Sequence, residues 1–179
     1  KQMKNLDLSK NKVLDFARDM FLFSFYTRGM SFVDMAYLKK TDLRNGILVY
    51  RRKKTGQLLS IEWTQQMQDI IDKYKSNTTQ YLLSIILRED GSERSQYLNQ
   101  SMKINRRLKE IASLIKLNMP LSLYVARHSW ATIARGKDIP ISVISEGLGH
   151  DSEVTTQIYL DSIKSSEVDK ANRKILSGL

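Results

Sequence analysis

The chain has 179 residues, no cysteine, and 29 Lys and Arg against 19 Asp and Glu, which gives a formal net charge of +10. This length fits one domain with a full hydrophobic core. Without cysteine there are no disulfides, cysteine-based zinc sites or thiol nucleophiles, and the positive charge favours a polyanionic partner, nucleic acid first. Because the sequence has neither an apolar run of about 18 residues nor a signal-peptide pattern, we expect a soluble, cytoplasmic protein with no membrane partner.

Long amphipathic segments with only two prolines predict a mainly helical domain. The expected helices are Ser9–Phe25, Phe32–Lys40, Thr64–Lys75, Glu93–Lys116, Leu123–Arg135, Pro140–Leu148, Glu153–Ile163 and Ser166–Leu176. Pro140 suits a first helical position, where its missing N–H is not needed.

One region departs from the helical pattern. In GILVYRRKKTGQLLSIEW, residues 46–63, apolar and β-branched runs flank KKTGQ, which predicts a β-hairpin with Gly56 in its turn. The stretch QYLLSIIL, residues 80–87, fits a third strand or a buried helical turn equally well. The predicted fold class is therefore mainly α with a small antiparallel hairpin or three-stranded sheet (α+β).

The hairpin tip concentrates four cations, Arg51, Arg52, Lys53 and Lys54. Such a run is ordinarily a solvated face. A two-stranded ribbon with cations at its tip can also reach the backbone or a groove of a duplex, and a lysine placed there can donate a proton to a leaving oxygen. The sequence permits both interpretations.

The segment SLYVARHSWATIARG predicts a helix capped by Ser122. Its expected core stripe is Leu123, Ala126, Trp130, Ile133 and Ala134. Tyr124 and Arg127 lie three residues apart on another side, with the small Ala131 beyond them, so a bulky ligand can approach Arg127. His128 points elsewhere. The simpler alternatives are a structural salt bridge for Arg127 and a locally hydrogen-bonded or core-edge histidine.

The segment FYTRGMSFVDMAYL places Arg28 just before a predicted helix start. Ser31 and Asp34 match the spacing of a capping box. A guanidinium beside a helix N-terminus, with free backbone amides nearby, suits a phosphate. Asp34 either completes the cap or orients a neighbouring arginine or histidine.

The stretch LGHDSEVTTQIYL places a histidine nine residues before a tyrosine. In one continuous helix, His150 and Tyr159 would lie on opposite faces. If Gly149 instead ends one helix and Asp151 or Ser152 caps the next, the chain reverses and the two polar groups converge.

The motifs that are missing narrow the chemistry. The sequence has no G-x-x-x-x-G-K-[ST] loop, no G-x-G-x-x-G after a strand and no H-E-x-x-H, so we expect neither a metal nor a cofactor. What remains suits metal-free phosphoryl transfer. Arginines clamp the oxygens of a phosphodiester, and a tyrosine attacks to form a covalent phosphotyrosyl intermediate that conserves the bond energy for rejoining.

The order of these motifs resembles the catalytic domain of tyrosine recombinases, the phage-integrase and Xer-like family. An arginine near a GM turn, the KTG of the hairpin, ARHSWAT, LGH and the later tyrosine follow one another, and the resemblance runs from about Leu14 to Lys174. Within the family the chain looks closest to integrases of conjugative transposons and related mobile elements. The resemblance implies a bacterial DNA-breaking and DNA-rejoining enzyme.

The resemblance also implies a role for each matching residue. Tyr159 matches the nucleophile that forms a 3′-phosphotyrosyl link and frees a 5′-hydroxyl. Arg127 matches the second catalytic arginine, and His150 matches the histidine that contacts the phosphate and helps to move protons. Lys54 matches the general acid for the leaving 5′-oxygen, with Lys53 as the alternative. The residues expected to contact DNA are Arg51, Arg52, Lys53 and His128.

Two positions depart from the family pattern. Tyr124 stands where the family has a histidine three residues before the second arginine, which keeps a hydrogen bond to the phosphate but puts the general base in doubt. Counted back from Asp34, the place of the first arginine falls on Ser31. We expect Arg28, one turn earlier, to reach the same phosphate as a catalytic residue, with Ser31 and Asp34 behind it. Otherwise Arg127 clamps alone or with a hairpin cation.

The family architecture implies a longer protein. We expect residues 1–179 to form one catalytic domain, the C-terminal part of an integrase whose DNA-clamping domain lies outside this chain, and residues 166–179 to pass to a neighbouring protomer. The leading hypothesis is strand exchange through a Holliday junction by a homotetramer on double-stranded DNA, monomeric alone. A type IB topoisomerase and a non-catalytic, basic helix-turn-helix DNA-binding protein are the alternatives.

Overall fold

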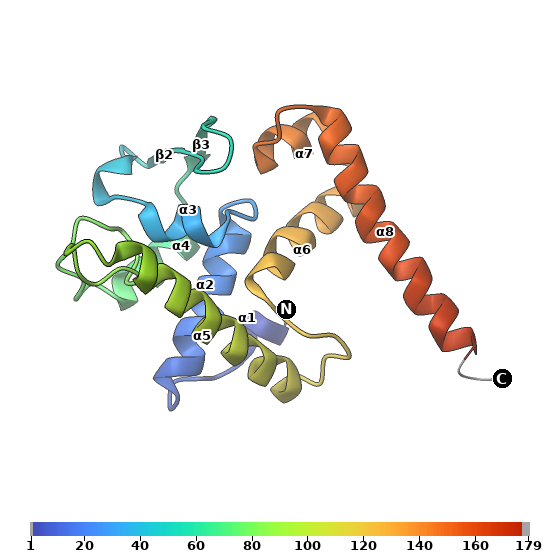
Figure 1. Ribbon diagram of the computed structural model, residues 1–179, viewed down its shortest axis with the longest axis horizontal. Coiled ribbons are helices and arrows are strands. Elements are labelled where there is room, and N and C mark those ends of the chain that lie inside the picture. The colour runs from blue at the N-terminus through green and yellow to red at the C-terminus, as the bar shows by residue number, and fades with distance from the viewer. Residues whose placement is uncertain (1, 177–179) are drawn as a thin grey trace.

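A computed structural model describes residues 2–176 and confirms the predicted fold class, a mainly helical fold with a small antiparallel sheet (Figure 1). Within the last helix, side chains are described up to residue 163 and at Arg173 and Leu176. The elements are α1 Gln2–Asn5, α2 Lys12–Tyr26, α3 Phe32–Tyr37, a 3-10 turn Lys40–Asp42, β1 Leu43–Arg44, β2 Ile47–Arg51, β3 Leu58–Glu62, α4 Gln65–Lys73, α5 Glu93–Leu114, α6 Leu123–Gly136, α7 Ile141–Leu148 and α8 Glu153–Leu176.

Helix α2 is the centre of the larger hydrophobic core, and it packs against α4, α5 and α6. It begins at Lys12, not at Ser9, because the Asn11 side chain accepts the N–H of Leu14 at 3.1 Å and caps the helix there. Most of its apolar side chains, with Phe23 fully buried, face this core, and Val13 is exposed. The short helix α1 before it was not predicted.

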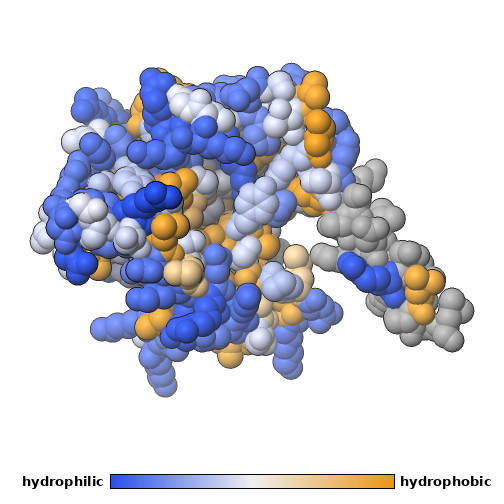
Figure 2. All heavy atoms as spheres, in the orientation of Figure 1, coloured by the Kyte–Doolittle hydropathy of each residue, from blue (hydrophilic) through white to orange (hydrophobic). Residues whose placement is uncertain are grey.

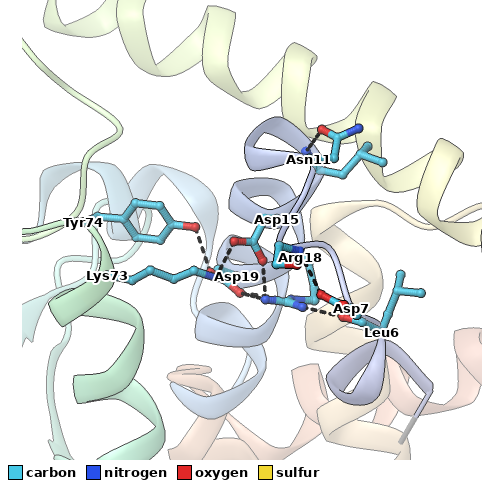
Figure 3. A network of polar contacts seen from close by, with 10 residues as sticks. Leu6, Asp7, Asn11, Asp15, Arg18, Asp19, Lys73 and Tyr74 are labelled. Carbon is cyan, nitrogen blue, oxygen red and sulfur yellow. Dashed lines mark hydrogen bonds and ion pairs between the residues drawn. The ribbon is translucent and has the colours of Figure 1, made fainter.

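A buried ionic network ties α2 to α4 (Figure 3). The carboxylate of Asp19, only 3% exposed, accepts from Arg18 Nη2 at 2.9 Å, from Lys73 Nζ at 2.8 Å and from the Tyr74 hydroxyl at 2.8 Å. Asp15 pairs with the same arginine and lysine. Both carboxylates therefore have cationic partners, as buried charges require.

The predicted hairpin is confirmed as β2 and β3. The third strand of the sheet is β1, which precedes the hairpin, and not residues 80–87. The sheet has the order β1-β2-β3, with Val49 opposite Ser60 in the antiparallel β2–β3 pair and Gly56 in the turn at φ +73°. Segment 80–87 is neither a strand nor a helical turn; it makes one isolated bridge, Tyr81 with Lys39. Two consecutive buried residues, Ile85 and Ile86, interrupt the alternation that a half-buried strand needs.

The C-terminal part folds around a second hydrophobic cluster formed by α6, α7 and α8. Pro140 takes the N-cap position of α7, one residue before the predicted place. The two last predicted helices are one continuous helix, α8, because the segment between Ile163 and Ser166 contains neither glycine nor proline to end it. The C-terminal half of α8 extends away from the other elements in Figure 1, and residues 177–179 of the segment expected to be exchanged lie outside the described residues.

The surface seen in Figure 2 is mostly hydrophilic, and its apolar side chains form separate small patches. None of the helices in residues 2–176 combines the length and the apolar character that a membrane span requires.

Candidate active site

A pocket of about 460 Å³ lies where the start of α3, the hairpin tip, the middle of α5, the start of α6 and the loop before α8 meet. Its lining includes six residues that the sequence analysis singled out, namely Ser31, Arg52, Lys54, Tyr124, Arg127 and His150. These residues come from segments that are far apart in the sequence, so the fold gathers the dispersed motifs as the resemblance implied.

Arg127 is a buried cation of the pocket, with 7% of its surface exposed. Its Nη1 donates to the Gly29 carbonyl at 3.0 Å, and its Nη2 donates to the Leu148 carbonyl at 2.7 Å. Arg127 makes no ion pair with any described residue, so the salt-bridge interpretation is wrong. Burial and then the charge of Arg52 lower the pKa of Arg127. A buried guanidinium without a carboxylate is suited to bind an anion.

Helix α6, which carries Arg127, differs from the sequence prediction in its cap and its core stripe. The Ser122 side chain makes no capping hydrogen bond; the Asn105 side chain of α5 accepts the N–H of Leu123 at 2.9 Å instead. Ile133 is 47% exposed and Ala131 is fully buried. The small alanine allows α6 to approach the second cluster closely, which turns Ile133 toward solvent.

His150 follows the chain reversal that the sequence predicted. Gly149 adopts φ +63° and ends α7, and the Ser152 hydroxyl accepts the N–H of Thr155 at 3.2 Å at the start of α8. The imidazole Nε2 lies 3.1 Å from Arg127 Nη2, and Nδ1 lies 2.8 Å from Thr156 Oγ1.

These two contacts define the protonation of His150. A guanidinium has only donors, so Nε2 accepts and Nδ1 carries the proton that it donates to Thr156. Burial first, and then the charges of Arg127 and Arg52, lower the pKa of His150 to about 4. His150 is therefore neutral at pH 7. Thr156, which is fully buried, was missed because nothing in the sequence marks a threonine six residues after a histidine as its partner.

Tyr159 lies against the two histidines. Its ring stacks on His128 with a centroid distance of 5.2 Å and 5° between the planes, and it contacts His150 edge-on at 5.6 Å. The hydroxyl is buried near that of Tyr124, makes no hydrogen bond of normal geometry with a described side chain, and is not part of the pocket lining. Burial, and secondly the neighbouring Tyr124 hydroxyl, raise the pKa of Tyr159, whereas Arg127 opposes the rise.

The hairpin tip divides its four cations between two sides. Arg52 is buried and donates to the Gly149 carbonyl, and Lys54 lines the pocket. Lys53 turns the other way, with its ammonium 4.6 Å from the centroid of the Tyr37 ring. Arg51 is exposed and bonds only the Gly56 carbonyl. Of the two candidate lysines, Lys54 is therefore the one that lines the same pocket as Arg127.

Arg28 does not take the place of the first arginine. It adopts a left-handed φ of +62° and is not among the residues that line the pocket, although its charge, like those of Arg52 and Arg127, acts on the buried Tyr50. Arg52, expected to contact DNA, is the second arginine in the pocket, which matches the alternative that a hairpin cation accompanies Arg127.

Ser31 and Asp34 do more than cap α3. The Ser31 hydroxyl accepts the N–H of Asp34 at 3.3 Å and donates to the Asp34 carboxylate at 2.6 Å. The other carboxylate oxygen accepts the backbone N–H of Lys53 at 2.7 Å. Asp34 thus orients the hairpin tip and neither an arginine nor a histidine.

His128, which we expected to contact DNA, lies instead between two tyrosine rings. Its ring is packed between Tyr124, edge-on at 4.4 Å, and Tyr159, and its Nδ1 is buried. Within the part of the chain that the structure describes, no group of three His, Asp or Glu side chains could hold a metal ion.

The fold is that of a known structural class. The chain superposes on a XerH site-specific recombinase bound to palindromic difH substrate with a TM-score of 0.65 and 17% identity, covering 95% of this chain and 48% of that one. It superposes on the Tn1549 transposon integrase in complex with transposon right-end DNA with a TM-score of 0.61 and 12% identity, covering 93% and 65% of the two chains.

The sequence identifies the family. Residues 3–166 match the phage integrase family, and the chain belongs to it. Tyrosine recombinase XerA of Thermococcus kodakarensis is 30% identical over 139 residues, 75% of this chain and 47% of its own length. A probable integrase/recombinase of Methanocaldococcus jannaschii is 27% identical over 144 residues, 77% of this chain and 43% of its own. The chain thus spans about half the length of the curated relatives it matches.

Proposed function

We propose that this chain is the catalytic domain of a site-specific DNA recombinase that cleaves and rejoins DNA without a metal, through a 3′-phosphotyrosyl intermediate. The observation that carries the proposal is the gathering of Arg52, Lys54, Arg127 and His150 around one pocket, with Tyr159 packed directly against His150. Family membership supports the same activity.

Two arginines hold the scissile phosphate. Arg127 and Arg52 are both anchored by backbone carbonyls, so neither charge is neutralised by a carboxylate. Guanidinium groups bind the non-bridging oxygens, where negative charge accumulates in the transition state. Tyr124, 57% exposed at the pocket, donates a further hydrogen bond to the phosphate.

The reaction exchanges one phosphate ester for another. The Tyr159 oxygen forms a bond to phosphorus while the bond from phosphorus to the 5′-oxygen breaks. The phenol proton passes to the neutral imidazole of His150, whose Nε2 becomes free when Arg127 turns to the phosphate. Lys54 donates a proton to the leaving 5′-oxygen. Rejoining is the reverse reaction with a second 5′-hydroxyl.

The partners are double-stranded DNA and further copies of the protein. The net charge of +10 supports binding to the DNA backbone, and XerH and the Tn1549 integrase were both solved with DNA. We propose a homotetramer on DNA, monomeric alone, with residues 166–179 exchanged between protomers. We also propose a cytoplasmic location and an N-terminal clamping domain beyond these residues.

The test is covalent trapping on DNA. The full-length protein is incubated with a library of nicked duplexes that carry a randomised core and 5′-bridging phosphorothiolates, and complexes that survive SDS are sequenced to find the cleaved site. The protein should form such complexes, and Tyr159→Phe should bind the recovered DNA but trap none. Trapping that persists in Tyr159→Phe would contradict the proposal, as would binding without any trapping by the unsubstituted protein, which is the behaviour of a simple helix-turn-helix binder. Strand exchange, as opposed to relaxation of supercoiled DNA, separates a recombinase from a type IB topoisomerase.

A further inference from the structure

Of the chain's two histidines, only His150 has a place in the proposed mechanism. His128 nevertheless makes the closest ring contact of the nucleophile, with 5.2 Å between centroids and planes 5° apart. Tyr124 packs edge-on against the ring of His128, with 4.4 Å between the ring centroids. Because residues 124 and 128 are four apart, they share one face of α6. Two adjacent residues of α6 therefore have different partners: Arg127 lines the pocket, and His128 contacts the nucleophile.

Ring contacts, rather than hydrogen bonds, hold Tyr159. Its hydroxyl makes no hydrogen bond of normal geometry with a described side chain, and its polar neighbour is the hydroxyl of Tyr124, which itself packs edge-on against His128. His128 covers a face of the ring, and His150 meets it at 78°. A buried hydroxyl without a partner is unfavourable, and offset-stacked or edge-on aromatic contacts offset that cost. Removing one of these rings should release the phenol.

His128 is suited to be a flat, neutral support. Burial and then the charge of Arg127 lower its pKa, so the imidazole is neutral at pH 7. Its Nδ1 is buried without a hydrogen-bond partner in the described part of the chain. A phenyl ring can therefore replace the imidazole without breaking a hydrogen bond at that atom.

We infer that His128 is a positioning residue for the nucleophile: its ring is the surface on which Tyr159 lies, and it directs the phenol oxygen toward Arg127. The inference rests on the proposed function of Tyr159. It assigns no proton transfer to His128, and it predicts that a ring at this position matters while its nitrogen atoms do not.

The first experiment reads the contact in the protein without DNA. A 3-fluorotyrosine is placed at position 159 of the full-length protein, and its ¹⁹F resonance is compared with that of the urea-unfolded chain. Stacking displaces the resonance, so His128→Ala should shift it toward the unfolded value, whereas His128→Phe should keep most of the displacement. An unchanged resonance in His128→Ala would overturn the inference, and this outcome does not depend on any activity.

The second experiment measures single-turnover covalent trapping at saturating protein on the DNA recovered above. His128→Ala should slow trapping at least about tenfold, because misplacing a reacting group by 1 Å costs up to about 10²-fold. His128→Phe should stay within about threefold of the unsubstituted protein, since stacking is retained. Thr132→Ala, an exposed position on the same helix, is the matched control and should match the unsubstituted rate.

The outcomes separate the two proposals. DNA affinity should be equal in all variants, because a positioning residue affects the rate and not binding. If His128→Phe is as slow as His128→Ala, or if His128→Ala is as fast as the unsubstituted protein, the inference fails while the proposed function stands. If the unsubstituted protein traps no DNA, the proposed function fails, and the ¹⁹F experiment still decides whether His128 holds Tyr159.

Discussion

Gly29 is the position where one added methyl group should disturb the site most. It has φ +74°, and a Cβ added there would lie 2.7 Å from the Cα of Arg127 and 2.8 Å from its Cγ. The nearest atom belongs to backbone, so it cannot swing aside as a side-chain end would. Gly46 is a matched control, because it has φ +73° and a Cβ added to it would have nothing within 4 Å.

The two substitutions separate strain from contact. Gly46→Ala should lower the free energy of unfolding by about 1–2 kcal/mol, the cost of left-handed backbone for an L-residue. Gly29→Ala has the same cost plus overpacking of about 1–3 kcal/mol, so we expect a loss of about 2–5 kcal/mol. Urea unfolding followed by tryptophan fluorescence measures both values.

Activity provides a second readout. Because the Gly29 carbonyl also accepts from Arg127 at 3.0 Å, displacing this segment moves the guanidinium as well. Covalent trapping should fall by about 10²-fold in Gly29→Ala and stay unchanged in Gly46→Ala. Equal losses of stability in the two variants, or normal trapping by Gly29→Ala, would refute the argument that the close approach to Arg127 requires glycine.

Three further predictions concern the charged groups. Arg52→Ala should slow covalent trapping by about 10²-fold, as expected for the loss of one donor to the transition state, and an unchanged rate in single-turnover assays would exclude Arg52 from the phosphate clamp. Asp19→Ala removes one of the two carboxylates that Arg18 and Lys73 share and leaves the Tyr74 hydroxyl without its acceptor, so urea unfolding should show a loss of about 1.5–3 kcal/mol, the value of hydrogen bonds to a charged group; a loss below about 1 kcal/mol, the value of an exposed pair, would contradict it. The pKa of His150 falls from 6.5 to about 4 on folding, so the folded state binds fewer protons between these values and stability decreases as the pH falls through that window. His150→Asn should flatten this part of the plot of urea midpoint against pH, and an unaltered slope would argue against a lowered pKa.

The sequence predicted the parts of the site that depend on local rules. Gly149 ends α7 and the chain reverses, so the prediction that His150 and Tyr159 converge is confirmed by their 5.6 Å ring contact. Most helices and the hairpin could also be predicted, because hydrophobic periodicity and turn residues are local features of the sequence. The break expected between Ile163 and Ser166 was wrong, because no glycine or proline stands there to end the helix.

The partners of the arginines could not be predicted in this way. Arg127 bonds the carbonyls of Gly29 and Leu148, and a backbone carbonyl carries no sequence signal. The same holds for Asp34, whose carboxylate accepts a backbone N–H from the hairpin, 19 residues later. Such contacts depend on the tertiary arrangement of segments, which residue types alone do not specify.

The burial of Arg52, in contrast, did have a signal. Along β2 the buried residues alternate with exposed ones, Leu48 and Tyr50 being buried and Val49 and Arg51 exposed. Side chains two residues apart point to the same face of a strand, so continuing this period places Arg52 on the inner face and Lys53 on the outer one. Treating RRKK as a single charge run concealed an alternation that separates its members.

The anchoring of the two arginines explains why this pocket suits a phosphate. Arg127 donates to the Leu148 carbonyl and Arg52 to the Gly149 carbonyl, both at the C-terminal end of α7. A helix C-terminus carries partial negative charge, which holds a cation in place without cancelling it. A carboxylate at that position would neutralise one guanidinium and repel the phosphate. With carbonyl anchors, both positive charges remain available to an anion, and, after burial, they are the next causes that lower the pKa of the adjacent His150.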